Sequence, residues 1–187
     1  AQVALGSAYL QQARAVKPEA RLEDPKYLEQ ALDNHRRGLE LAQAGGDPLI
    51  EAVARIAQAK SYRLLGETYY FLNDYTEANR LFDLVVAEVK QVVPLLAGSQ
   101  QYRLLAQAYE AQGAAYLQQG DILRRQQKIE ESRARFELAK TAYQSCIEQG
   151  NKAYFDEILR TKVIEQGCQR YYDVATEYAQ KLEGAQQ

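Results

Sequence analysis

The stretch Gly113-Ala114-Ala115-Tyr116-Leu117-Gln118-Gln119 nearly repeats Gly6-Ser7-Ala8-Tyr9-Leu10-Gln11-Gln12 from the start of the chain. Between the two copies, Leu65-Gly66-Glu67-Thr68-Tyr69 has the same core, a small residue followed three positions later by tyrosine. Recurrence at intervals of tens of residues is typical of repeat architectures, in which each unit packs against its neighbours. These stretches therefore predict a solenoid.

The composition is that of a folded helical protein. Of the 187 residues, 47% are hydrophobic and 26% are charged, which separates the chain from disordered sequences. There are only four Pro and eleven Gly, while strong helix formers such as Ala, Leu, Gln, Glu and Arg dominate. Apolar residues recur at helical spacing almost everywhere, and no run alternates as a strand would. We therefore expect an all-α fold.

Charge and hydropathy exclude two classes of partner. The net charge of -2 provides no basic surface for phosphates, so we expect no nucleic acid. No apolar run approaches the roughly 20 residues that span a bilayer, so we expect no membrane insertion. The chain begins at Ala1 and contains no Met, which we interpret as a fragment or processed product from which a targeting segment could have been removed. The expected compartment is the cytoplasm.

Turn and cap signals divide the chain into about seven helices. We expect them at residues 2–14, 25–44, 48–72, 75–92, 99–119, 134–147 and 152–182. Pro18 and Pro25 enclose a polar connection, and Asp24 is the expected N-cap of the second helix. Gly120-Asp121 is expected to break or bend the chain, and Gly150-Asn151 to close the sixth helix. We favour one continuous terminal helix over the start of a truncated further repeat.

One segment carries a known repeat pattern, Tyr62-x-x-Leu65-Gly66-x-x-Tyr69 followed by Ala78-x-x-x-Phe82 and by Pro94. This segment resembles the tetratricopeptide repeat. The resemblance implies that Gly66 lets the first helix of a pair approach the second closely, while Tyr69 and Phe82 fill the wedge between them. Tyr62 stands where the family has Trp, and Pro94 lies a few positions late.

Other copies fit the pattern less closely. Leu5-Gly6-x-x-Tyr9 is followed by Ala31-x-x-x-His35 after about thirteen extra residues, and Tyr109, Gly113 and Tyr116 by Ala139-x-x-x-Tyr143 after about fourteen. A fourth copy begins at Gly167, with Tyr171 one position late. The resemblance implies a single right-handed superhelical α-solenoid of antiparallel helix pairs over residues 1–187, with repeats at 1–46, 47–97, 98–150 and 151–187.

Candidate catalytic and metal-binding groups are few. His35 is the only histidine, which excludes His-based metal clusters, and we interpret it as a packed wedge residue in the first repeat. Glu130-Glu131 and Glu23-Asp24 lie in polar stretches without apolar neighbours that would raise a carboxyl pKa for acid catalysis. No Gly-rich phosphate loop occurs. We therefore expect no enzyme activity, no cofactor and no metal.

Cys146 and Cys168 are expected to be reduced. If the chain turns near Gly150, the two cysteines differ in height along the hairpin by about 20 Å at 1.5 Å per residue. A disulfide needs Cα atoms about 5.5 Å apart. A bend before Gly167 is the alternative that would bring Cys168 within reach.

The resemblance also implies a binding face, because the first helices of tetratricopeptide pairs line a concave surface that commonly binds peptides or a partner's helix. The family's groove positions fall on Lys60, Arg63, Glu67, Tyr70 and Phe71 in the second repeat, on Gln107, Glu110, Ala114 and Leu117 in the third, and on Ile164, Cys168, Tyr171 and Tyr172 in the fourth. Aromatic and Arg side chains supply much of the energy at such interfaces. We therefore expect a non-catalytic module that binds a peptide or helix with apolar anchors and an acidic group.

Two alternatives stay open at this stage. Incomplete terminal repeats leave apolar helix faces, at the chain ends or on the convex side, through which a second copy could dock as a homodimer. The other alternative is an all-α enzyme or ligand-binding domain with a tyrosine-lined pocket.

Overall fold

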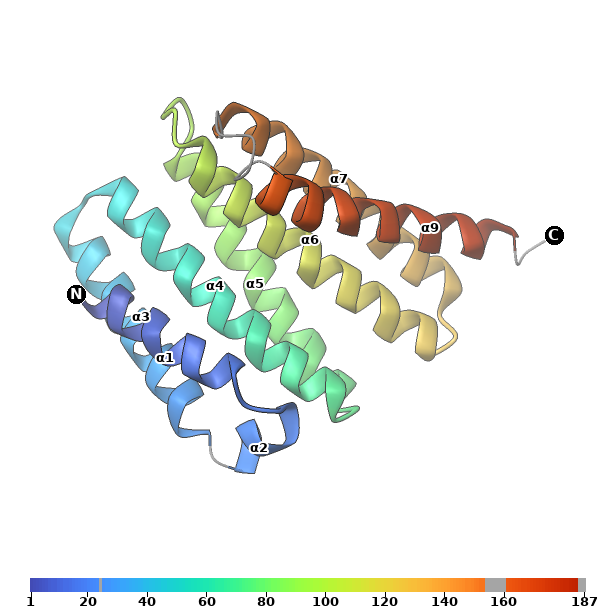
Figure 1. Cartoon of the computed structure of the whole chain (residues 1–187), viewed down its shortest axis with the longest axis horizontal. Helices are drawn as coiled ribbons and strands as arrows, with labels where there is room; N and C mark the ends of the chain where they lie inside the picture. The colour runs from blue at the N-terminus through green and yellow to red at the C-terminus, as the bar shows by residue number, and fades with distance from the viewer. Residues whose placement is uncertain (24, 154–160, 185–187) are drawn as a thin grey trace. The chain divides into compact units, whose positions relative to one another are not determined.

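The computed structural model describes residues 1–23, 25–153 and 161–184, and all the regular structure in these ranges is helical (Figure 1). The all-α prediction is therefore confirmed. The helices are α1 (Gln2–Arg14), α2 (Pro18–Glu23), α3 (Lys26–Gly45), α4 (Pro48–Phe71), α5 (Tyr75–Leu95), α6 (Tyr102–Arg125), α7 (Ile129–Ala153), the π-helix η1 (Thr161–Gln169) and α9 (Arg170–Gly184). None of them is long and apolar enough to cross a membrane.

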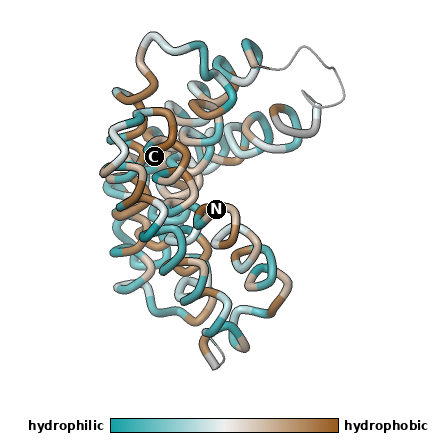
Figure 2. The backbone as a smooth tube through the Cα atoms, turned by 90° about the vertical axis from the view of Figure 1, so that its left-hand side faces the viewer, coloured by the Kyte–Doolittle hydropathy of each residue, from teal (hydrophilic) through white to brown (hydrophobic). Residues whose placement is uncertain are grey.

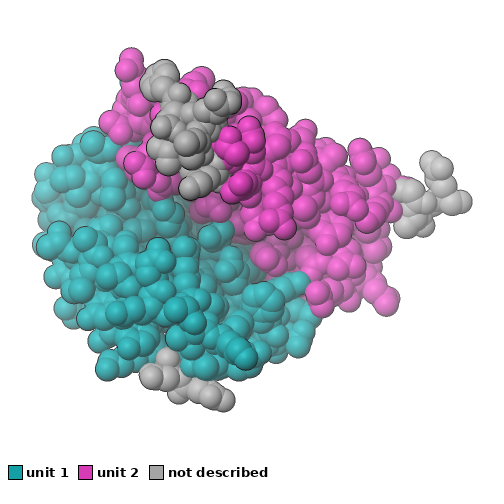
Figure 3. Space-filling view, in the orientation of Figure 1, with its two compact units in different colours: residues 1–98 teal, residues 99–187 magenta. Residues whose placement is uncertain are grey.

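The chain divides into two compact units, Ala1–Gly98 and Ser99–Gln187, which Figure 3 colours separately. The boundary lies next to the end of the second predicted repeat, at residue 97. Brown and teal segments alternate along the helices in Figure 2, as expected where each helix buries one face and exposes the other. The single continuous solenoid over residues 1–187 stays a prediction.

The first unit is built around α4, which packs against α1, α2, α3 and α5. Leu64 of α4 joins a buried cluster with Leu10, Ala13, Leu28 and Ala31 from α1 and α3. On the other side of α4, the valine-rich face of α5 is buried. Burying aliphatic side chains of this size contributes about 1.5–3 kcal/mol each, so these contacts dominate the stability of the unit.

Local cap signals place the helix boundaries in the first unit. The Asp47 side chain accepts hydrogen bonds from the backbone nitrogens of Leu49 (2.9 Å) and Ile50 (3.2 Å). Gly46 ends α3 in the left-handed conformation, at φ 68°. The predicted turn and cap at these positions are confirmed, whereas the predicted cap Asp24 lies outside the described residues.

The predicted polar connection between Pro18 and Pro25 contains a short helix, α2. Its Arg21 donates hydrogen bonds to the carbonyl oxygens of Ala13 (2.9 Å) and Arg14 (3.2 Å), at the end of α1. Arg21 also donates to Thr68 Oγ1 of α4, at 3.3 Å. The partly buried guanidinium therefore satisfies carbonyls that the end of α1 leaves open and links that end to α4. The helix was missed because it depends on these tertiary contacts.

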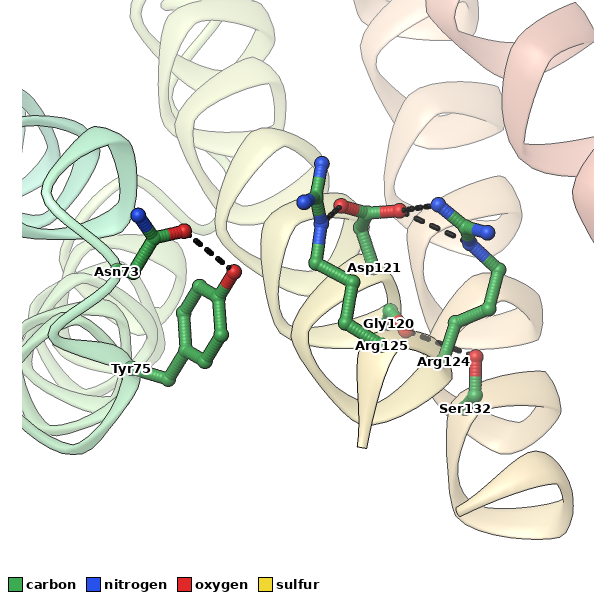
Figure 4. Close-up of polar contacts among 7 residues, drawn as sticks. All are labelled: Asn73, Tyr75, Gly120, Asp121, Arg124, Arg125 and Ser132. Carbon is green, nitrogen blue, oxygen red and sulfur yellow. Dashed lines mark hydrogen bonds and ion pairs between the residues drawn. The ribbon is translucent and has the colours of Figure 1, made fainter. Parts of the chain in front are cut away.

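In the second unit, the predicted break at Gly120-Asp121 is wrong, because α6 continues to Arg125. A Cβ atom at Gly120 would lie 2.6 Å from Cε1 of Phe136, so this glycine permits close packing of α7. Ser132 also donates a hydrogen bond to the Gly120 carbonyl oxygen, at 2.8 Å (Figure 4). The glycine therefore marks a helix contact where the sequence suggested a turn.

The α4–α5 and α6–α7 connections have the same geometry. Asn73 and Gln127 both have φ 61°, in the left-handed region. In each turn the next residue donates a backbone hydrogen bond five positions back, from Asp74 to Tyr69 (3.0 Å) and from Lys128 to Leu123 (2.9 Å). This is the six-to-one bond of a Schellman motif. The turn at Asn73-Asp74 was predicted, and the second turn was not.

The two hairpins also share their register. Tyr116, Gly120 and Phe136 repeat the spacing of Tyr62, Gly66 and Phe82. A Cβ atom at Gly66 would lie 2.8 Å from Phe82, much as at Gly120 and Phe136. The residues treated as an insertion between Tyr116 and Ala139 therefore form the last turns of α6, the connecting turn and the first turns of α7.

The predicted closure of a helix at Gly150-Asn151 is wrong, since α7 continues to Ala153. Gly150 instead packs against Ile164, whose Cδ1 would lie 2.8 Å from an added Cβ. The predicted helix over 152–182 includes residues 154–160, which lie outside the described residues. The described remainder changes from π-helical to α-helical hydrogen bonding at Arg170.

Candidate binding surfaces

The predicted positions on α4 lie along one stripe of the helix, at spacings of three or four residues. They are Lys60, Arg63, Glu67, Tyr70 and Phe71, and we call them the α4 stripe. Phe71 is 60% exposed and the other four side chains are partly buried. Arg63 Nε lies 3.6 Å from Glu67 Oε1, which makes an ion pair one turn apart.

The C-terminal end of the α4 stripe is aromatic. The rings of Tyr70 and Phe71 are 5.6 Å apart and meet edge to face, and Tyr70 also lies 6.0 Å from Tyr75 of α5. Tyr75 donates a hydrogen bond to Asn73 Oδ1, at 2.8 Å (Figure 4). Phe71 is therefore an exposed ring in edge-to-face contact with Tyr70, at the end of a row of three aromatic side chains.

The predicted positions on α6 are all partly buried. They are Gln107, Glu110, Ala114 and Leu117. Leu117 packs against a core cluster of Phe136, Ala179 and Leu182, which joins α7 and α9. Leu117 therefore contributes to the core of the second unit.

The fourth predicted set falls on η1 and α9. Ile164 is only 4% exposed, and Tyr171 is exposed with its ring stacked on Tyr143 at 5.8 Å. Tyr172 lines a polar recess of about 420 Å³ with α7 side chains such as Lys140 and Glu137. Of this set, Tyr171 and Tyr172 are accessible, whereas Ile164 belongs to the core.

Cys146 and Cys168 form a disulfide, so the prediction that they are reduced is wrong. Their Cα atoms are 6.1 Å apart, within the usual range for a disulfide. The prediction placed the turn near Gly150. In fact α7 ends at Ala153, seven residues after Cys146. The π-helix η1 begins at Thr161, seven residues before Cys168. The two cysteines therefore reach similar heights on neighbouring helices.

His35 is fully buried between α1 and α4, which confirms its interpretation as a packed residue. Its Nδ1 lies 2.8 Å from Ser61 Oγ, and its Nε2 lies 3.3 Å from Ser7 Oγ. Burial lowers the pKa of His35, Lys60 adds to the lowering, and a hydrogen bond to the Val3 backbone opposes it. Neither ring nitrogen contacts a carboxylate in the described part of the chain, so the geometry is that of a neutral packing group.

The described residues contain no cluster of His, Cys, Asp and Glu that could hold a metal ion. Of the carboxylate pairs considered in the sequence, Glu130 and Glu131 are exposed in the first turn of α7. The Glu23 side chain and Asp24 lie outside what the structure describes.

A second surface, which the sequence did not point to, lies between α3 and α4 within the first unit. It consists of two adjoining recesses that share Glu29 and Leu32, and we call it the α3–α4 groove. The first recess, of about 430 Å³, is lined by Leu22, Pro25, Leu28, Glu29, Leu32, Leu65 and Tyr69. The second, of about 300 Å³, is lined by Glu29, Leu32, Asp33, Arg36, Gln58 and Tyr62.

The α3–α4 groove follows helical stripes on both of its walls. On α4, Gln58, Tyr62, Leu65 and Tyr69 are spaced by three or four residues, so they share one side of the helix. Tyr69 and Tyr70 therefore face different surfaces, one the α3–α4 groove and the other the α4 stripe. Tyrosine and leucine recur along this side of α4, but the family pattern assigned such residues to the wedge between helices, and nothing in the sequence marked a groove.

Gln58 is the most buried polar group in the α3–α4 groove, with 6% of its surface exposed. Its Nε2 donates a hydrogen bond to the hydroxyl of Tyr62, at 2.8 Å. Its Oε1 is buried and has no hydrogen-bond partner among the described residues. A buried polar atom without a partner costs about 1–3 kcal/mol, so this oxygen is a marked feature of the second recess.

Comparisons of the chain with protein-family models, with curated proteins and with solved structures find no match. The tetratricopeptide resemblance therefore depends on the pattern from Tyr62 to Phe82, together with its counterpart from Tyr116 to Phe136.

Proposed function

We propose that this chain is a non-catalytic, tetratricopeptide-like module that binds a peptide or helical segment of another protein along the α4 stripe. The observation that carries the proposal is Phe71, a large aromatic side chain left 60% exposed at the end of that stripe. The edge-to-face contact with Tyr70 restricts one edge of the Phe71 ring, which lowers the entropy cost of ordering it on binding. Rigid aromatic anchors of this kind often dominate the energy of protein interfaces.

The repeat resemblance supports the proposal through the register of the hairpins. Gly66 faces Phe82, as the resemblance implies for the small and aromatic positions of a helix pair, and Gly120 makes the same kind of contact with Phe136. In such modules the first helix of each pair contributes to the binding face. The α4 stripe lies on the first helix of its pair.

A bait experiment with matched variants tests this function. Cell extract is passed over the immobilised chain, over Phe71→Ser and over Leu138→Ser, which alters an exposed apolar residue on α7. We expect a partner that the wild type and Leu138→Ser retain and Phe71→Ser loses. Retention by all three chains would contradict binding along the α4 stripe.

A second candidate function is self-assembly, because large apolar side chains are exposed on the last turns of α3 and the first turn of α4. Leu41 is 65% exposed and Ile50 is 53% exposed, and Leu49, next to Ile50 in the chain, is also exposed. Exposed apolar surface of this kind can mark an association site. We expect Leu41→Lys with Ile50→Lys to abolish any concentration-dependent increase in mass measured by light scattering. A wild type that stays monomeric at high concentration would exclude this function.

We further infer that the chain matures in an oxidising compartment, in place of the expected cytoplasm. The Cys146–Cys168 disulfide supports this inference, since such bonds persist in secreted and periplasmic surroundings and are rare in the cytosol. Thiol labelling of the protein from its native source, with and without reductant, tests it. Full labelling without reductant would contradict it.

A further inference from the structure

We propose that the α3–α4 groove is a docking site for a helical peptide that carries a large apolar side chain and an Arg or Lys one or two turns away. The inference rests on the proposed function of protein binding and adds to it a surface and a partner chemistry. It starts from the two recesses of the groove, which differ in character although they share Glu29 and Leu32.

The first recess provides the apolar half of the site. Leu28, Leu32 and Leu65 line it, together with Pro25 and the ring of Tyr69. Its volume of about 430 Å³ is large enough for a leucine or phenylalanine side chain. Filling it would remove apolar surface from water at both partners, which favours binding.

The second recess provides hydrogen-bond acceptors. Glu29, Asp33 and Gln58 line it, and the buried Oε1 of Gln58 has no hydrogen-bond partner in the described part of the chain. Asp33 is already paired with Arg36, at 2.7 Å, whereas Glu29 forms no ion pair with another described residue. Glu29 and Gln58 line the same recess, so a bound cation with several N–H groups, such as a guanidinium, can reach the carboxylate directly and the buried amide oxygen once the Gln58 side chain turns toward it.

The spacing of the two recesses selects a helical ligand. On α3, the residues that line the second recess lie about four positions from those that line the first, which is about 6 Å along the helix at 1.5 Å per residue. On α4 the corresponding offset is about seven positions, or about 10 Å. Positions i and i+4 or i+7 of a bound helix span the same distances. One helix can therefore place an apolar side chain in the first recess and a basic side chain in the second.

The probes for testing this site are peptides selected from a displayed library of random sequences, long enough for four helical turns, against the immobilised full chain. The most enriched peptides are synthesised, and their Kd values are measured by fluorescence anisotropy. The variants are Glu29→Gln and Gln58→Leu in the groove, Glu40→Gln on the exposed side of α3, and Phe71→Ser on the α4 stripe. Circular dichroism checks that each variant keeps its helicity.

We expect the enriched peptides to pair Arg or Lys with Leu, Ile or Phe at the spacing given above. Glu29→Gln and Gln58→Leu should each weaken binding about tenfold, which is what loss of a charge-assisted hydrogen bond costs. Glu40→Gln should leave the Kd unchanged. Peptides without a basic residue, or Kd values that neither groove variant alters, would overturn the inference.

The failure of this inference can be told apart from the failure of the proposed function. Some peptides could lose binding to Phe71→Ser and keep their binding to both groove variants. That result would overturn the groove site and support the α4 stripe. A library that yields no binding peptide at all would count against both.

Discussion

Gly66 and Phe82 are in direct contact across the α4–α5 pair, so close that a Cβ atom on Gly66 would lie 2.8 Å from Cε1 of the ring. Phe82 is fully buried, so its ring cannot move away without disturbing its neighbours. The absence of a side chain at Gly66 therefore sets the distance between these two helices.

Replacing Gly66 by alanine should lower the free energy of unfolding by about 1–3 kcal/mol, because the new methyl group overpacks a full core. Gly45 is the matched control, since no atom lies within 4 Å of a Cβ built there. Gly45→Ala should raise stability by up to about 1 kcal/mol, through the lower entropy of the unfolded chain. Urea denaturation of both variants measures the difference. Equal stability of the two variants would contradict the close contact.

Reduction of the Cys146–Cys168 disulfide should lower the stability of the second unit by about 3 kcal/mol, since a loop of this length then regains its freedom in the unfolded state. Thermal unfolding with and without reductant tests this prediction. The double variant Cys146→Ser with Cys168→Ser should unfold like the reduced wild type and should not respond to reductant. A wild type that is equally stable in both conditions would show that the bond contributes nothing.

Stability should fall as the pH is lowered below 6.5, because burial lowers the pKa of His35 from that value in the folded chain. Below pH 6.5 the unfolded chain binds a proton that the folded chain does not. The stabilisation is therefore fully present above pH 6.5 and is lost as the pH falls toward the lower pKa that His35 has in the folded chain. One proton gives a slope of at most about 1.4 kcal/mol per pH unit. The lowered carboxyl pKa values of Glu51 and Glu77 act below 4.5, outside this window.

Urea denaturation at several pH values between 5 and 7.5 measures this slope. The control is His35→Phe, which keeps an aromatic ring between Gly6 and Ser61 and removes the titrating group. Its stability should change less with pH in this range. A slope that is the same in both chains would assign it to other groups.

Gln127 holds a left-handed φ of 61° that glycine adopts at lower cost. Gln127→Gly should therefore stabilise the α6–α7 hairpin by about 1 kcal/mol. The control is the neighbouring Gln126, whose φ of -83° offers glycine no such advantage. Gln126→Gly should lower stability, and a differential scanning calorimetry comparison distinguishes the two. Destabilisation by both changes would contradict the turn geometry.

Local signals in the sequence placed several elements correctly. Asp47-Pro48 and Asn73-Asp74 marked helix boundaries because caps and turns depend on a few neighbouring residues. Gly120 was misinterpreted because its role depends on Phe136, which packs against it from the next helix. For the same reason the disulfide was missed, since its geometry depends on where α7 ends.

Of the two candidate surfaces, the sequence predicted the α4 stripe and missed the α3–α4 groove. The tetratricopeptide resemblance assigned Lys60, Arg63 and Glu67 to one face, and their helical spacing is consistent with a common stripe. The α3–α4 groove could not be predicted, since it requires the position of α3 against α4 and the orientation of Gln58. Nothing in the residue pattern shows that an amide oxygen is buried without a partner.

The matching register and turns of the α4–α5 and α6–α7 hairpins make them interchangeable modules. A chimera in which residues 62–82 replace residues 116–136 would keep the glycine contact, the left-handed turn and the ring that fills the gap between the helices. Tandem duplication of such a hairpin could lengthen a gene without requiring a new way to join two helices. Different side chains on the outer faces of the copies would then allow each to acquire its own ligand.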